Sequence, residues 1–230
     1  MPYLQRHDID EAIVAAAGTL HKCGYRHCLF GSAACYLYLR LARQPIPRTP
    51  NDVDIVVFPD RDVSIDAEDI KHNMTIQDPR FFLTESKKPG ATYKVLWFRP
   101  QGRPRVGVNY FEACKIDMLV DEDAKNPSSL EIPYVPSDLL KICHVKLYQN
   151  GSTIVQAKER SPAPEGVRVC IMPSLMLLFL KIKGWEDHGN SEEERFRKKV
   201  PNDVLEILLL TQHVVFTSSF GIELDQLELK

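Results

Sequence analysis

Leu29-Phe30-Gly31-Ser32 and, after a helix-length segment, Arg48-Thr49-Pro50-Asn51-Asp52-Val53-Asp54-Ile55-Val56-Val57 are the stretches that decide the fold. Alternate residues of an extended strand point to the same face, so Asp52 and Asp54 aim together while Val53 points into the core. Two convergent carboxylates at a strand end suit a divalent metal. A Gly-Ser turn at the start of a helix suits a phosphate. Together the two stretches indicate metal-dependent chemistry on a nucleotide.

Composition limits the possible classes of protein. The 230 residues, 44% of them hydrophobic and 26% charged, are ordinary for a globular protein of one large or two small domains. A net charge of −2 does not point to nucleic acid, and we expect no DNA partner. The six cysteines are scattered without a C-x-x-C pair, which favours a reduced, cytoplasmic location. The apolar run from Val169 to Ile182 is too short and interrupted to span a bilayer, so we expect no membrane association.

Hydrophobic periodicity predicts a mixed α/β (α+β) chain that becomes mostly helical towards its end. Helices are expected from Asp8 to Leu20 and over 32–43, 66–77, 137–148, 172–185 and 202–213, and strands over 25–30, 53–58, 81–84, 92–98 and 115–120. The strands predict a mixed sheet with flanking helices. We expect residues 1–130 to form a catalytic domain and residues 131–230 to form a mostly helical region that closes the cleft.

A third carboxylate, Asp117, stands on the strand predicted for residues 115–120, between Ile116 and Met118. Burying an ionised carboxylate is costly unless it is paired or bound to a metal. A single aspartate at a strand end also commonly caps a turn, and for Asp117 alone that alternative is equally acceptable. Taken together with Asp52 and Asp54, however, Asp117 completes a set typical of a metal site.

These residues, in this order, resemble the signature of the nucleotidyltransferase superfamily, the family with the fold of DNA polymerase beta. The signature is an apolar residue, Gly, then Gly or Ser, a helix, Asp-x-Asp on the next strand and a carboxylate on a later strand. The approach from Arg48 to Asp52 is similar to the Arg-x-Thr-x-Asp-x-Asp form of the minimal, antitoxin-linked members, although Thr49 stands one position earlier. The chain is most similar to uncharacterised fungal members. The segment between Ser32 and Asp52 is longer than usual, and its prolines predict an extended loop.

The resemblance implies two-metal phosphoryl transfer. Asp52, Asp54 and Asp117 would be both the catalytic residues and the ligands of Mg²⁺ or Mn²⁺, and Asp117 would hold the metal nearer the acceptor hydroxyl. One metal would activate the attacking oxygen, and the other would neutralise the leaving pyrophosphate. An NTP such as ATP would be the substrate. Asp117 is also a candidate to accept the proton of the hydroxyl.

Four residues are candidates for nucleotide binding. Gly31 would let the backbone approach the triphosphate, and Ser32 would offer a hydroxyl and an amide at a helix N-terminus. Arg48 would contact phosphate or form an ion pair with a motif aspartate. Lys181, on the helix predicted for residues 172–185, would reach the triphosphate or extend from a buried helix into solvent, and Lys183 is a nearby substitute.

The sequence therefore predicts a metal-dependent nucleotidyltransferase that moves a nucleoside monophosphate from an NTP to an acceptor hydroxyl and releases pyrophosphate. The acceptor is a small molecule, an RNA end or a protein side chain. Two alternatives stay open. One is a catalytically idle nucleotide-binding or interaction protein on the same fold, and the other is a toxin-like enzyme that modifies tRNA or protein.

Overall fold

The computed structural model describes residues 4–46, 48–58, 65–102, 112–120, 141–147, 153–157 and 166–220. Within these ranges the chain forms a mixed sheet of eight strands in the order β3-β4-β5-β2-β1-β8-β6-β7. The strands are β1 (Arg26–Phe30), β2 (Asp52–Phe58), β3 (Phe81–Glu85), β4 (Lys94–Phe98), β5 (Cys114–Val120), β6 (Lys141–Leu147), β7 (Thr153–Ala157) and β8 (Val167–Ile171). The mixed α+β class expected from the sequence is confirmed.

The central strands explain how the two aspartates of β2 acquire a third neighbour. β2 lies between β1, to which it is antiparallel, and β5, to which it is parallel. Val53, Ile55 and Val57 are fully buried on one face of β2. Because side chains alternate along a strand, Asp52 and Asp54 project from the other face. The register pairs Asp54 with Asp117 of β5, so these two carboxylates are neighbours across the ladder.

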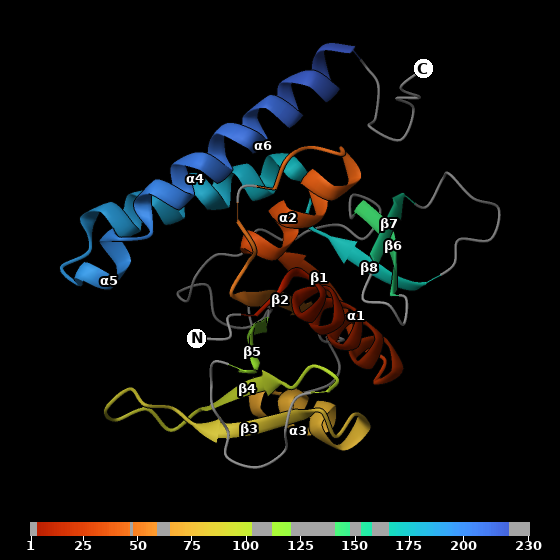
Figure 1. The fold of residues 1–230 in the computed structure, drawn as a ribbon. Helices are drawn as coiled ribbons and strands as arrows, with labels where there is room; N and C mark the ends of the chain where they lie inside the picture. Colours follow the sequence, from red (N-terminus) through yellow and green to blue (C-terminus); the bar gives the residue numbers. More distant parts are fainter. Residues whose placement is uncertain are drawn as a thin grey trace.

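The helices cover both faces of the sheet (Figure 1). They are α1 (Arg6–Lys22), α2 (Gly31–Leu41), α3 (Ala67–Gln77), α4 (Ser174–Asn190), the short α5 (Glu194–Arg197) and α6 (Val200–Phe220). α1 and α3 pack on the face that carries the buried valines of β2. α2 contacts β1, β2 and α4, and Met176 and Leu180 of α4 pack against Val56 on the other face. α4 and α6 lie side by side as a helical pair across α2.

α1 and α2 are held by apolar burial and by one polar network. Ile9, Ile13 and Leu20 of α1 are fully buried, as the three- and four-residue spacing predicts. The buried Tyr36 hydroxyl of α2 donates to Asp10 of α1 at 2.9 Å. These contacts fix α2, and therefore the turn at its first residue, against the sheet.

One secondary-structure prediction is wrong. The helix expected over residues 137–148 is contradicted where the structure describes this segment, because residues 141–147 form strand β6, which pairs with β7 and β8. Cys143 and Val145 are buried, and the less buried His144 lies between them. This alternation is typical of a strand, and it extends the sheet into the second half of the chain. The expected domain boundary between residues 130 and 131 lies outside the described residues.

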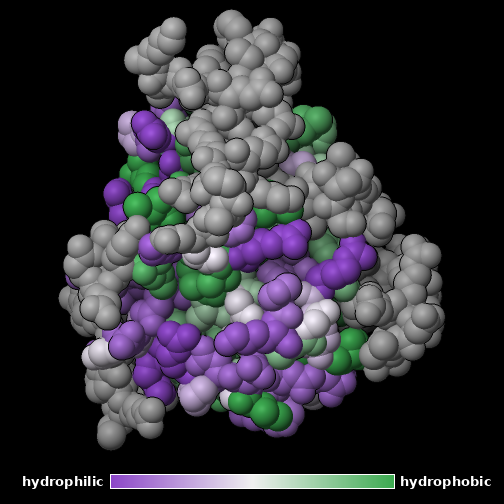
Figure 2. All heavy atoms as spheres, turned by 90° about the vertical axis from the view of Figure 1, so that its right-hand side faces the viewer, coloured by the Kyte–Doolittle hydropathy of each residue, from purple (hydrophilic) through white to green (hydrophobic). Residues whose placement is uncertain are grey.

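The outer surface is mainly polar on the face shown in Figure 2. Hydrophilic side chains dominate the described part of that face, and the hydrophobic ones gather in small separate patches. Within the described ranges, no helix combines the length and the hydropathy that crossing a bilayer requires.

Candidate metal and nucleotide site

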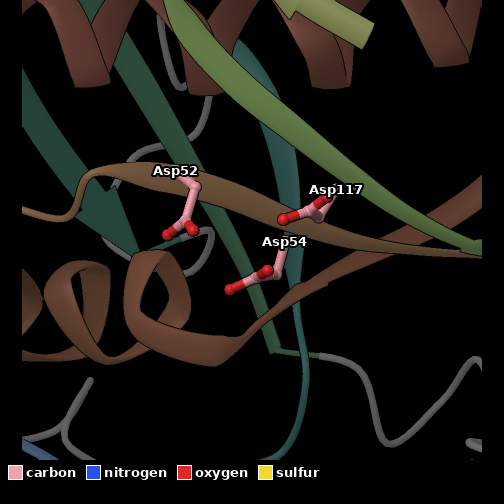
Figure 3. A group of neighbouring side chains, drawn as sticks. All are labelled: Asp52, Asp54 and Asp117. Carbon is pink, nitrogen blue, oxygen red and sulfur yellow. The ribbon is translucent and has the colours of Figure 1, made fainter. Parts of the chain in front are cut away.

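Asp52, Asp54 and Asp117 converge at one edge of the central strands. Each of the three offers a carboxylate oxygen, and the three oxygens lie within 4.8 Å of one another. Figure 3 shows Asp52 and Asp54 projecting from β2 and Asp117 from the neighbouring strand β5. Three carboxylate oxygens at this separation are the hard ligand set that Mg²⁺ and Mn²⁺ prefer. The structure thus brings together the three residues that the sequence predicts as a metal site.

Without a bound cation, partial burial and the repulsion among the carboxylates of Asp52, Asp54 and Asp117 raise the pKa values of Asp52 and Asp54. Burial and the neighbouring Asp117 raise the pKa of Asp52. Burial, together with the charges of Asp52 and Asp117, raises the pKa of Asp54 to about 7. Clustered carboxylates cannot all ionise cheaply without a positive partner. A divalent cation supplies that partner, so the electrostatics of the three residues fit a metal.

Gly31 is the point at which the backbone comes closest to this cluster. Its φ is +64°, in the left-handed region that glycine adopts most readily. A Cβ at this position would stand 2.0 Å from Oδ2 of Asp54, which is impossible without movement. The position therefore requires glycine for both its conformation and its space, and the group that takes this space is Asp54. The approach of a triphosphate to Gly31 stays a prediction.

Ser32 follows at the N-terminus of α2, and its hydroxyl lies at the centre of a polar cluster. The hydroxyl accepts hydrogen bonds from Arg48 at 2.8 Å and from Lys181 at 3.2 Å. It donates to Glu206 of α6 at 3.2 Å. We call Ser32, Arg48, Lys181 and Glu206 the Glu206 cluster. Three of the predicted nucleotide-binding residues are thus brought together from α2, the loop before β2 and α4.

Glu206 is the member of the cluster that the sequence reasoning missed. Its carboxylate contacts Nζ of Lys181 at 2.5 Å and an Nη of Arg48 at 2.6 Å, and only 6% of its side chain is exposed. Burial is the largest single influence and lowers the pKa of Lys181, but the charge and hydrogen bond of Glu206 together with the charges of Cys35 and Asp54 outweigh it, so the pKa is raised. The signal that could have found Glu206 is its spacing from Asp203 and Leu210, because all three lie on the buried stripe of α6.

The contacts of Arg48 and Lys181 bear on the alternatives stated for them, whereas contact with phosphate stays a prediction. Lys181 neither extends into solvent nor stands free, because only 12% of its side chain is exposed and it is paired with Glu206. Arg48 forms its ion pair with Glu206, and its buried Nε has no hydrogen-bond acceptor among the described residues. Lys183 is exposed and paired with Asp187, so it is no substitute for Lys181.

Two further lysines place positive charge near the three carboxylates. Nζ of Lys115 on β5 lies 2.6 Å from Oδ2 of Asp117. The charge of Lys199, just before α6, acts on Asp52 and opposes the rise in its pKa. Lys199 is exposed and lies one residue before the start of α6. Both lysines therefore border the site from opposite halves of the chain.

Comparison with solved structures identifies a protein with the same fold. The chain is similar to the crystal structure of an antigenic nucleotidyltransferase-like protein from the fungus Paracoccidioides brasiliensis, with a TM-score of 0.58 and 14% sequence identity. The match covers 92% of this chain and 78% of the other. No family model and no curated protein matches the chain. The likeness shows a nucleotidyltransferase-like fold and confirms the resemblance drawn from the sequence.

Proposed function

We propose that this protein is a metal-dependent nucleotidyltransferase, which transfers a nucleoside monophosphate from an NTP to an acceptor hydroxyl. The observation that carries the proposal is the convergence of Asp52, Asp54 and Asp117 within 4.8 Å, with Gly31 directly against Asp54. A metal site alone has many uses, but here it adjoins a helix N-terminus that can bind phosphate. A location in the cytoplasm stays a prediction.

Asp52, Asp54 and Asp117 would hold Mg²⁺ or Mn²⁺, which when bound would polarise the phosphate and lower the pKa of the acceptor hydroxyl. Gly31 leaves room for the triphosphate, and the amide and hydroxyl of Ser32 bind its oxygens. Arg48 and Lys181 orient the same groups from the loop before β2 and from α4. We further propose that residues 131–230 contribute the helical wall of the cleft, with Lys181 and Glu206 on it.

The proposed transfer needs no reactant other than the NTP and the acceptor hydroxyl. The acceptor oxygen forms a bond to the α-phosphorus, and the bond from that phosphorus to the oxygen bridging to the β-phosphorus breaks. Pyrophosphate leaves, and the proton of the hydroxyl passes to Asp117 and then to solvent. The residues of the chain act mainly by positioning these groups and by stabilising charge, as is general in phosphoryl transfer.

The proposal is tested by titration calorimetry with Mg²⁺ and each NTP, followed by a pyrophosphate-release assay with a panel of hydroxyl acceptors. We expect binding that requires Mg²⁺ and turnover with at least one acceptor. Changing Asp52 or Asp54 to Ala should abolish turnover while the fold is retained. Retained turnover in both variants would overturn the proposal.

One observation favours the idle nucleotide-binding alternative. Arg48 and Lys181 share the single negative charge of the buried Glu206, so part of their positive charge is already compensated and attracts a triphosphate less strongly. That alternative predicts binding of Mg²⁺ and NTP without pyrophosphate release for any acceptor. Labelled NTP incubated with total RNA and lysate tests the toxin-like alternative, because label confined to small molecules would exclude it.

A further inference from the structure

A second opening adjoins the carboxylate cluster on the side away from the Glu206 cluster. The described residues enclose a cavity of about 410 Å³ between the first turn of α3, the start of β4 and the middle of β5. Asp117 and Lys115 line it. Asp117 thus belongs both to the carboxylate cluster and to the wall of this cavity, so a molecule in the cavity would meet the metal at Asp117.

The cavity lies where the ladder between β4 and β5 ends, beside the first turn of α3. That ladder runs from Phe98–Cys114 to Leu96–Ile116, whereas Lys94 is paired with β3. The backbone amide of Lys94 donates to Glu68 at 3.1 Å, and its carbonyl accepts from Lys71 at 2.7 Å. Glu68 and Lys71 are themselves an ion pair at 2.6 Å. These two α3 side chains therefore take the hydrogen bonds of Lys94 that β5 does not.

The cations that the cavity offers to a ligand are Lys94 and Lys115. Glu68 and Lys71 neutralise each other. Asp66 keeps its negative charge at the N-terminus of α3, where it accepts from the backbone amide of Asp69 at 2.8 Å. Within the described part of the chain, the ammonium of Lys94 has no ion-pair partner. Lys115 forms an ion pair with Asp117. If Asp117 also bound a metal ion, its carboxylate would divide its charge between that ion and Lys115.

From this arrangement we propose that the cavity binds the acceptor, and that the acceptor is a small hydroxyl compound carrying an anionic phosphate or carboxylate group. The inference rests on the proposed function. The anionic group pairs with Lys94 and Lys115, the exposed Tyr93 ring at the rim covers the carbon skeleton, and the hydroxyl points to Asp117. A volume of about 410 Å³ lies in the range of small-molecule sites, which favours this class over an RNA end.

The experiment uses D-ribose 5-phosphate and D-ribose as matched probes that differ only in the anionic group. Each is titrated into the protein in the presence of Mg²⁺ and a non-hydrolysable ATP analogue, which fills the phosphate turn. Backbone amide NMR shifts report the location of the probe. We expect ribose 5-phosphate alone to bind and to shift the signals of residues 93–96 and 115–118.

Two variants and a control assign the contact. Lys94→Gln should weaken binding of ribose 5-phosphate about tenfold, the loss expected for one charge-assisted contact. Lys94→Arg should restore it. Lys88→Gln removes an equally exposed charge from the β3–β4 turn outside the cavity, and it should have no effect. Equal binding of the two probes, binding of neither, or equal loss in Lys94→Gln and Lys88→Gln would overturn the proposal.

Failure of this inference is distinct from failure of the proposed function. Calorimetry with Mg²⁺ and the ATP analogue should give the same affinity in the wild type and in all three lysine variants. If the analogue does not bind to the wild type, the proposed function fails. If the analogue binds and labelled nucleotide is transferred to RNA rather than to an anionic small molecule, only the acceptor assignment fails.

Discussion

Gly31 and Asp54 lie in such close contact that a Cβ on the glycine would stand 2.0 Å from Oδ2 of the carboxylate. The two residues come from different elements, the start of α2 and the middle of β2. The antiparallel register of β1 and β2 brings them together, because it pairs Phe30 with Asp54. The turn at Gly31 and the carboxylate of Asp54 are therefore in direct contact, so under the proposed function a change to the turn would displace a metal ligand.

The first prediction follows from that contact. Gly31→Ala should lower the affinity for Mn²⁺ at least about tenfold, because Asp54 must move to make room for the new methyl group. Calorimetric titration with Mn²⁺ measures the effect. Gly24→Ala is the matched control, since Gly24 also has a positive φ (+81°) but nothing lies within 4 Å of the added Cβ.

Both alanine variants carry the strain of the left-handed conformation, about 1 kcal/mol. We therefore expect Gly31→Ala and Gly24→Ala to lose similar amounts of stability, and this shared loss does not test the role of Gly31. The difference in Mn²⁺ affinity is informative, and equal affinities in the two variants would show that Gly31 does not support the metal site.

The second prediction concerns the buried carboxylate of Glu206. Glu206→Gln should lower the free energy of unfolding by about 3 kcal/mol, because it leaves the cations of Lys181 and Arg48 buried without a counter-charge. The double variant Glu206→Gln with Lys181→Met should recover part of this loss, because one unpaired charge is removed with its partner. Urea denaturation measures the free energy of unfolding of the wild type, of Glu206→Gln and of the double variant.

Glu194→Gln provides the control for this series, since it removes an exposed ion pair with Lys198. Its cost should be less than about 1 kcal/mol. A Glu206→Gln variant no less stable than Glu194→Gln would contradict the assignment of Glu206 as the ion-pair centre that fixes α6 to α2 and α4.

The third prediction is a pH dependence of the metal-free protein. The folded-state pKa of Asp54, about 7, lies above its ordinary value of 3.8, so the folded state holds a proton that the unfolded state releases. The stability from this group is fully present below pH 3.8 and is lost as the pH rises through 7. Asp54→Asn should therefore gain stability over the wild type between pH 5 and pH 8, on the order of 2 kcal/mol.

Urea denaturation with EDTA at the two pH values checks this expectation, and the exposed Asp187→Asn is the control. Mg²⁺ at pH 8 should stabilise the wild type and have less effect on Asp54→Asn, because the variant has lost a metal ligand. A difference between Asp54→Asn and the wild type that does not change with pH would contradict the assigned cause.

The Asp52/Asp54 pair could be predicted because its two-residue spacing is local and places both side chains on one face of any strand. Asp117 alone could equally cap a turn. Its pairing with Asp54 depends on the parallel register of β2 and β5, which the structure supplies. Gly31, like the Asp52/Asp54 pair, could be predicted from local sequence, since it ends one strand and begins a helix.

The spacing of Glu206 within α6 could place it on the buried side of that helix, but its contact with Ser32 and the cavity could not be predicted, because both depend on contacts between distant segments. Ser32 and Glu206 are 174 residues apart in the sequence, and no local pattern connects them. The cavity depends on where Glu68 and Lys71 of α3 fall relative to Lys94. The helix predicted for residues 137–148 is wrong for another reason: Cys143 and Val145 are buried with the less buried His144 between them, and this two-residue period is that of a strand.

The central claim is that Asp52, Asp54 and Asp117 hold a divalent metal beside a nucleotide whose phosphates lie at Gly31 and Ser32. A crystal soaked with Mn²⁺ and a non-hydrolysable ATP analogue tests it most directly, because Mn²⁺ can be located by its anomalous scattering. We predict an anomalous peak among the three carboxylates and the triphosphate against the first turn of α2. A peak elsewhere, or a nucleotide bound away from Ser32 with no metal at the carboxylates, would contradict the account.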